Sequence, residues 1–84
     1  MDMDNFDVYP ISHNGRVYNV ITAMDLMFRE VRGMIDALVA LGAFIAGADA
    51  HEPGDLFTCA VEGFVFEVDV RGSDVVVYRR ERAK

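Results

Sequence analysis

Residues 57–77 read FTCAVEGFVFEVDVRGSDVVV, which is three alternating apolar and polar runs separated by two turn signals. A tight turn at Glu62-Gly63 and a II′-type turn at Gly72-Ser73 would each fix the register between neighbouring strands. Both registers place the same side chains on one face: Phe57, Cys59, Val61, Phe64, Phe66, Val68, Val70, Val75 and Val77. They also pair Phe66 with Arg79 and leave a polar, solvated face of Thr58, Glu67, Asp69, Arg71, Asp74, Tyr78 and Arg80. The stretch therefore predicts a three-stranded antiparallel meander with one apolar face.

Residues 5–22 have the pattern of a β-hairpin around Asn14-Gly15. Both central residues of a type I′ turn need positive φ, which Asn and Gly adopt most readily. The resulting register pairs Ile11 with Tyr18, Tyr9 with Val20 and Val8 with Ile21. Both faces of the hairpin then carry apolar side chains, so we expect it to be covered on both sides. Pro10 has no backbone N–H, which places its strand at a sheet edge or its missing donor outward.

A long helix is expected after the hairpin. Thr22-Ala23-Met24-Asp25 is a weak form of the capping box, so the helix is predicted to begin at Thr22 and to run to about Gly47. Its large apolar residues recur at three- and four-residue steps: Met24, Met27, Phe28, Val31, Met34, Ile35, Leu38, Leu41 and Ile45. Such a stripe must pack on the sheet.

These elements predict an α+β fold in the order ββαβββ, with one long helix packed on an antiparallel sheet. The N-terminal hairpin and the C-terminal meander would form that sheet. An alternative interprets Gly63 as a bulge in one long strand, which gives ββαββ. The 84 residues contain no linker and no repeat, so a single domain over 1–84 is expected.

Length and charge narrow the classes of function. The formal net charge is −6, and an acidic body attracts basic partners and repels nucleic acid. Cys59 is the only cysteine, so self-association or partner binding, rather than a disulfide or a cysteine-based zinc site, is expected to stabilise so short a chain. No apolar run reaches the roughly 18–20 residues that span a bilayer. The N-terminus is acidic where a secretory signal is basic, so we expect no membrane association and a cytoplasmic location.

The back of the predicted helix is expected to be a contact surface. Its residues are small and apolar over one face, with an aromatic on the flank: Gly33, Ala37, Ala40, Ala43, Gly47 and Phe44. An exposed helix face usually carries Lys and Glu instead, so this face predicts close contact with another backbone. The simplest form is a symmetric homodimer, helix against helix. The acidic hairpin end, with Asp2, Asp4 and Asp7, is a second predicted contact, suited to a basic partner.

The sequence gives little support for catalysis, cofactors or metals. Cys59 falls on the predicted apolar face, and arginines near Glu67 and Asp69 can neutralise those carboxylates. The loop residues Asp49, His51, Glu52 and Asp55 could hold a cation, but their spacing matches no known metal loop. The glycines form neither a phosphate-binding loop nor a dinucleotide fingerprint. We therefore expect no catalytic residues, no cofactor and no metal.

The expected function is a small non-enzymatic protein-interaction module, such as a regulatory adaptor or a phage-type inhibitor. Phage-encoded inhibitors of bacterial defence systems are similar to this chain in size and charge only. One alternative is an oligomeric ligand-binding or catalytic domain with a pocket between subunits, lined in part by the helix methionines. A second is nucleic-acid binding through the C-terminal basic residues Arg79, Arg80, Arg82 and Lys84, which the acidic body opposes.

Overall fold

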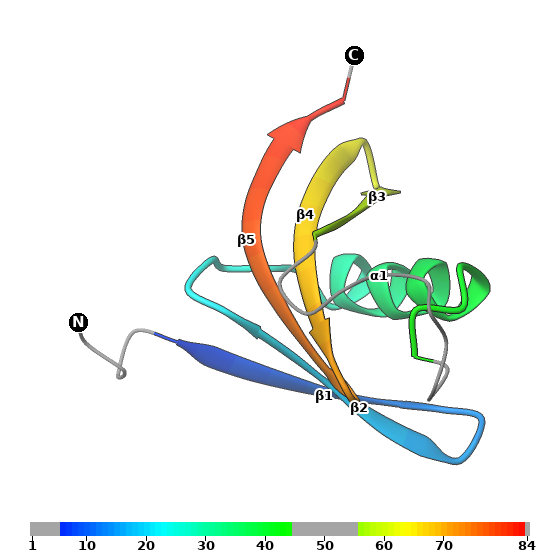
Figure 1. Cartoon of the computed structure of the whole chain (residues 1–84). Helices are drawn as coiled ribbons and strands as arrows, with labels where there is room; N and C mark the ends of the chain where they lie inside the picture. The colour runs from blue at the N-terminus through cyan, green and yellow to red at the C-terminus, as the bar shows by residue number, and fades with distance from the viewer. Residues whose placement is uncertain (1–5, 45–55, 84) are drawn as a thin grey trace.

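The computed structural model describes residues 6–44 and 56–83. In chain order they form β1 (Asp7–His13), β2 (Arg16–Thr22), α1 (Phe28–Ala40), β3 (Phe57–Val61), β4 (Phe64–Arg71) and β5 (Asp74–Arg82). The strands make one sheet, and α1 lies on one side of it (Figure 1). The predicted α+β class and the order ββαβββ are confirmed. Within the described part of the chain, no helix is long and apolar enough to cross a membrane.

The sheet has the strand order β1-β2-β5-β4-β3. β1 and β2 pair antiparallel, as do β3 with β4 and β4 with β5. β2 and β5 instead run parallel, with Val20 opposite Val75. The prediction of a wholly antiparallel sheet is therefore wrong at this one junction. Antiparallel neighbours are joined by short turns that a sequence reveals, whereas parallel neighbours are joined by a long crossover that carries no local signal.

Tight turns set the registers of two of the three antiparallel strand pairs, β1 with β2 and β3 with β4. Asn14 and Gly15 have φ of 51° and 80°, and Glu62 and Gly63 have φ of 53° and 85°. Two successive positive φ values are the type I′ conformation, whose twist matches that of the flanking strands. The predicted pairings are observed: Val8 with Ile21, Tyr9 with Val20, Ile11 with Tyr18, Val61 with Phe64, Cys59 with Phe66 and Phe57 with Val68. The alternative that treats Gly63 as a bulge is wrong.

β1 is an edge strand of the sheet and contains Pro10, as the sequence predicts. An edge strand exposes a row of backbone donors and acceptors that could pair with another chain. Because proline cannot donate, Pro10 interrupts the donor pattern of this strand and makes it a poorer template for strand addition.

The helix begins later than predicted, at Phe28. The hydroxyl Oγ1 of Thr22 accepts a hydrogen bond from the backbone N–H of Met24 at 3.0 Å, which closes a turn rather than a helix. The N-cap is Met27, and its backbone N–H donates to Oε1 of Glu30 at 2.8 Å. Glu30 thus accepts from the N-cap backbone N–H, which is the half of a capping box that the N3 side chain provides. The predicted start at Thr22 is wrong because that residue belongs to the buried end of β2.

The helix also ends earlier than predicted, at Ala40. The backbone N–H of Gly42 donates to the carbonyl of Val39, and that of Ala43 donates to the carbonyl of Leu38, both at 3.0 Å. Gly42 has φ of 75°, and these two bonds are the Schellman pattern that closes a helix. The predicted helical continuation through residues 41–44 is therefore wrong, and residues 45–47 lie outside the described residues.

The core lies between α1 and the sheet face toward it, which we call the inner face. Four residues of the predicted stripe are fully buried there: Val31, Met34, Ile35 and Leu38. The predicted apolar face of the meander supplies Cys59, Val61, Phe66, Val68, Val70, Val75 and Val77, all buried in the same cluster. The predicted stripe is not buried beyond these residues, since Met27 before the helix, Phe28 at its first position and Leu41 after it are exposed. Burial of this stripe is the main reason that α1 is stable at its position.

The back of α1 is partly covered by the chain itself. A Cβ atom added to Gly33 would lie 2.6 Å from Cγ1 of Val61, which belongs to β3. Gly33 is therefore required for close approach of the helix to this strand.

We predict that Gly33→Ala destabilises the fold although alanine is the better helix former. Overpacking costs about 1–3 kcal/mol, which exceeds or offsets the roughly 1 kcal/mol gained in helix propensity. Urea unfolding of Gly33→Ala, Val61→Ala and the double variant measures the effect. The double variant should be more stable than the sum of the single changes implies, and strict additivity would contradict the contact.

Candidate protein-binding surface at the start of α1

The predicted contact residues on the back of the helix do not form one exposed face. Ala37 is half-buried and Ala40 is exposed, but Ala43 and Phe44 are buried. The ring of Phe44 packs 4.4 Å from the ring of Tyr18, centroid to centroid. The reason is the early helix end, because the turn after Ala40 returns the chain to the core. The exposed small face expected through Ala43 and Phe44 is thus corrected, and Gly47 lies outside the described residues.

Of the other predicted site residues, only some are among the described residues. Asp7 is exposed at the start of β1, whereas Asp2 and Asp4 lie outside the described residues. The same holds for Asp49, His51, Glu52 and Asp55. Among the residues that are described, no three of His, Cys, Asp and Glu gather to hold a metal ion.

The outward face of β4 is less solvated than predicted. Asp69 is buried, and its Oδ2 accepts a hydrogen bond from Nε of Arg71 at 2.8 Å. This hydrogen bond and the charge of Asp69 raise the pKa of Arg71. Arg71 therefore neutralises Asp69, as expected, whereas Arg80 is occupied elsewhere.

A β-bulge in β5 redirects Arg80. Glu67 pairs with Arg79, but the next residue of β4, Val68, pairs with Val77, so Tyr78 is an extra residue. One extra residue shifts the side-chain alternation, and later residues exchange faces. Phe66 consequently pairs with Arg80, which lies on the inner face. The predicted pairing of Phe66 with Arg79, and the place of Arg80 on the polar face, are wrong for this reason.

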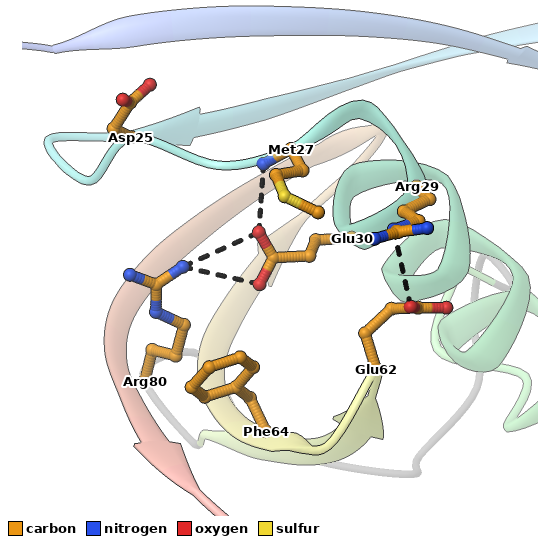
Figure 2. Close-up of a pocket in the computed structure, with 7 residues that line it drawn as sticks. All are labelled: Asp25, Met27, Arg29, Glu30, Glu62, Phe64 and Arg80. Atoms are coloured by element: carbon orange, nitrogen blue, oxygen red, sulfur yellow. Dashed lines mark hydrogen bonds and ion pairs between the residues drawn. The ribbon is translucent and has the colours of Figure 1, made fainter.

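Arg80 meets a buried carboxylate at the start of α1 (Figure 2). Its Nη1 lies 3.3 Å from Oε2 and 3.5 Å from Oε1 of Glu30, whose side chain is 4% exposed. The same guanidinium lies 5.0 Å from the centre of the Phe64 ring. Because Glu30 also accepts the N–H of Met27, one buried carboxylate joins the start of α1 to β5.

A cavity of about 360 Å³ opens beside this ion pair. Figure 2 shows its lining, which comes from α1, the segment before it, the turn between β3 and β4, and strands β4 and β5: Asp25, Met27, Arg29, Glu30, Glu62, Phe64 and Arg80. Glu30 and Arg80 cancel each other's charge, and Nε of Arg29 lies 3.4 Å from Oε1 of Glu62. Asp25 has no hydrogen-bond or ion-pair partner among the described residues. The cavity therefore carries one uncompensated negative charge.

Two exposed apolar side chains lie at the start of α1. Met27 lines the cavity and is 50% exposed, whereas Phe28, the next residue, is 65% exposed and is not part of the lining. We call the surface formed by Asp25, Met27, Phe28, Arg29, Glu62 and Phe64 the α1 surface. An exposed aromatic and a methionine beside paired charges is the composition that protein interfaces favour.

The sequence did not predict the start of α1 at Met27 and Glu30, or the place of Arg80 beside it, for two reasons. Thr22 is a better cap residue than Met27, so local preference favours the wrong helix start. The acid at Glu30, three residues after Met27, is the one signal that could have located the true start. For Arg80 there is no signal, because the bulge at Tyr78 arises from pairing between strands.

Cys59 is placed as the sequence predicts, on the inner face and buried. Burial raises the pKa of its thiol from 9.0 to about 11. A thiol that stays protonated at neutral pH is a poor nucleophile, so its position supports a packing role.

Comparisons of the chain with protein-family models, with curated proteins and with solved structures found no match.

We predict that Glu30 stabilises the fold by two separable contacts. Glu30→Ala removes both the bond to Met27 N–H and the pair with Arg80, and should cost about 2–3 kcal/mol. Glu30→Gln keeps an acceptor for the N–H and should cost roughly half as much. Urea unfolding measures both. Equal losses for the two variants would show that only the ion pair matters.

We predict that Cys59 is protected from alkylation in the folded state. Its pKa of about 11, against 9.0 when unfolded, makes the thiolate about 100-fold scarcer near pH 8. Iodoacetamide labelling followed by mass spectrometry should be slow in buffer and fast in urea. The unfolded thiol loses its proton first as pH rises, so stability should fall between pH 9 and about 11. Fast labelling of the native chain would contradict this placement.

Proposed function

We propose that this chain is a small acidic protein-interaction module without catalytic activity, which binds a basic partner protein through the α1 surface. The observation that supports this most is the pair of exposed apolar side chains at the start of α1, Phe28 and Met27, of which Met27 lines a cavity whose one uncompensated charge belongs to Asp25. A regulatory adaptor or an inhibitor of the phage type would work in this way, by occupying a partner rather than by chemistry.

The apolar part of the α1 surface supplies an anchor for a protein partner. Burial of a phenylalanine side chain contributes about 1.5–3 kcal/mol, which is the size of a binding hot spot. Phe28 is in the first turn of a helix whose other end and inner stripe are fixed by the core, so little ordering is needed on binding. The preformed position of this side chain favours recognition by a rigid surface.

The charged part of the α1 surface favours a cationic group on that partner. Glu30 with Arg80, and Arg29 with Glu62, leave Asp25 as the residual charge of the cavity. The whole chain adds a net charge of −6, which raises the local concentration of a basic protein around it. A Lys or Arg that enters the cavity would meet Asp25 and Glu62 while its aliphatic stem packs on Met27.

The two alternatives have less support. Arg79 is paired with Glu81 at 2.6 Å and Arg80 with Glu30, so two of the basic residues proposed for nucleic acid already have acid partners. Of the methionines proposed to line a pocket between subunits, Met34 is fully buried in the core of the chain. We also propose that the chain forms a homodimer and that it is located in the cytoplasm.

We predict that Phe28→Ser and Asp25→Asn each weaken capture of a basic protein from a lysate of the native host by about tenfold or more. Both changes are at exposed positions, so circular dichroism should match the wild type. The matched control is Val17→Ser, an exposed apolar residue on β2. Quantitative mass spectrometry of the bound fraction measures the effect. Equal capture by all four proteins, or an acidic partner, would contradict the proposal.

A further inference from the structure

β5 has an edge that β2 covers only in part. The pairing of β2 with β5 ends where Ile21 lies opposite Val76, and β5 continues beyond it to Arg82 (Figure 1). The opposite edge of β5 stays paired with β4 as far as Phe64 opposite Arg82. Among the described residues, no backbone group pairs with the β2 side of residues 78–82. We call this side of residues 78–82 the free edge of β5.

A cavity shows that the chain leaving β2 does not fill the space beside β5. The cavity has a volume of about 440 Å³, and its lining includes Ala23 and Met24 after β2 and Val76, Val77 and Tyr78 of β5. Val76 and Val77 are consecutive in a strand, so their side chains point to opposite faces of the sheet. A cavity that both of them line lies at the edge of β5 rather than over one face. The free edge is therefore open at the point where β2 leaves it.

The usual protection of an edge strand is weak here. Bulges and charged side chains protect such edges in many proteins. The bulge at Tyr78 lies at the start of the free edge, and the next four residues pair with β4 in unbroken register. Arg79 donates to Glu81 at 2.6 Å, and Arg80 is held on the inner face by Glu30. Two of the three arginines of this segment are thus neutralised within the chain, and its backbone edge can accept an added strand.

We propose that the free edge of β5 pairs antiparallel with the free edge of a second copy of this chain, which joins the two sheets into one. The proposal rests on the homodimer proposed above and names its interface. Backbone N–H and C=O groups of an edge are complementary to any extended strand, so the side chains decide whether a second copy fits. A two-fold axis then requires the side chains of the edge to be complementary to themselves.

Side-chain charges select one register of the two strands. A two-fold axis perpendicular to the sheet keeps the inner faces of both copies on the same side, so paired residues must point to the same face. Arg79 and Glu81 are two residues apart and share the outer face. One allowed register places each Arg79 opposite Glu81 of the other copy. The two neighbouring allowed registers place Arg79 opposite Arg79 or Glu81 opposite Glu81, and like charges in these positions repel.

The other side chains of the free edge fit the same register. It places Arg80 opposite Arg80 on the inner face, where each guanidinium is already neutralised by its own Glu30. It brings Arg82, which is exposed and has no ion pair among the described residues, to the 53% exposed Tyr78 of the other copy. An arginine beside a tyrosine ring is a favourable contact. Residues 79–82 also hold three arginines in an acidic chain, so this contact joins the least acidic parts of the two copies.

The test is the mass of the full chain by sedimentation equilibrium from about 1 μM to about 1 mM, the range in which weak dimers form. The wild type should be a dimer at the upper end. Arg79→Glu and Glu81→Arg each replace two attractive cross-strand pairs by two repulsive ones, and each should raise the dimer Kd by about tenfold or more. The matched control is Arg32→Glu, which makes the same charge change as Arg79→Glu at an exposed position on α1 and should leave the Kd unchanged.

An equimolar mixture of Arg79→Glu and Glu81→Arg separates this contact from effects within the chain. In the mixed dimer, the two acids of one copy lie opposite the two arginines of the other, so the mixture should dimerise with a Kd near that of the wild type. The pair of Arg79 with Glu81 inside each chain stays broken in both variants. A loss of stability within the chain therefore could not produce this recovery.

Hydrogen exchange of the wild type locates the contact directly. Amide exchange in residues 78–82 should slow as the concentration rises, because pairing protects the N–H groups of the free edge. A dimer with unchanged exchange there, a dimer that survives Arg79→Glu and Glu81→Arg, or a mixture that stays monomeric would overturn this interface and leave the proposed homodimer intact. A monomer at every concentration would overturn both. None of the changed residues belongs to the α1 surface, so these outcomes leave the proposed partner binding unaffected.

Discussion

Strict alternation of side chains along the strands, fixed by two-residue turns, is the constraint on which the rest of this fold depends. The positive φ values at Asn14-Gly15 and Glu62-Gly63 allow only one register in each hairpin. In those registers the apolar residues of β2, β3 and β4 fall on the same inner face. A single slip would turn them outward, so the stripe of α1 has one surface to cover and the helix has one place to lie.

A bulge in β5 interrupts this alternation and brings an arginine to a buried glutamate. The extra residue Tyr78 moves Arg80 from the outer to the inner face, where it meets Glu30. Without the bulge, the carboxylate that caps α1 would be buried with no counter-charge, at a cost of several kcal/mol. The bulge therefore supplies the counter-charge for the carboxylate that caps α1, and both residues of this ion pair line the cavity. Met27, the N-cap of α1, lines this cavity together with Asp25 and is exposed.

Two surfaces of different character are left after the core is formed. The α1 surface combines exposed apolar side chains with one uncompensated negative charge, which suits a basic partner. The sheet face opposite α1 carries the apolar side chains of Val8, Ile21 and Val76. A domain of 84 residues buries a smaller share of its surface than a larger domain does, so binding of a partner that recognises only the folded chain would raise its stability by mass action.

The sequence by itself determined the elements that depend on local chemistry. Asn-Gly and Glu-Gly turns, period-two strands and the three- and four-residue steps of Val31, Met34, Ile35 and Leu38 predicted the hairpins, their registers and the buried stripe. Tertiary structure alone decided the parallel pairing of β2 with β5, the bulge at Tyr78 and the ion pair of Glu30 with Arg80. These join residues that are distant in the chain, and their free energy comes from pairing and burial that no local preference encodes. The ends of α1 depend on both local sequence and tertiary structure. Glu30 can accept the N-cap N–H and Gly42 can adopt positive φ, so both true ends carry a local signal. Thr22 is also a good N-cap residue, and only its place at the buried end of β2 excludes it as the helix start.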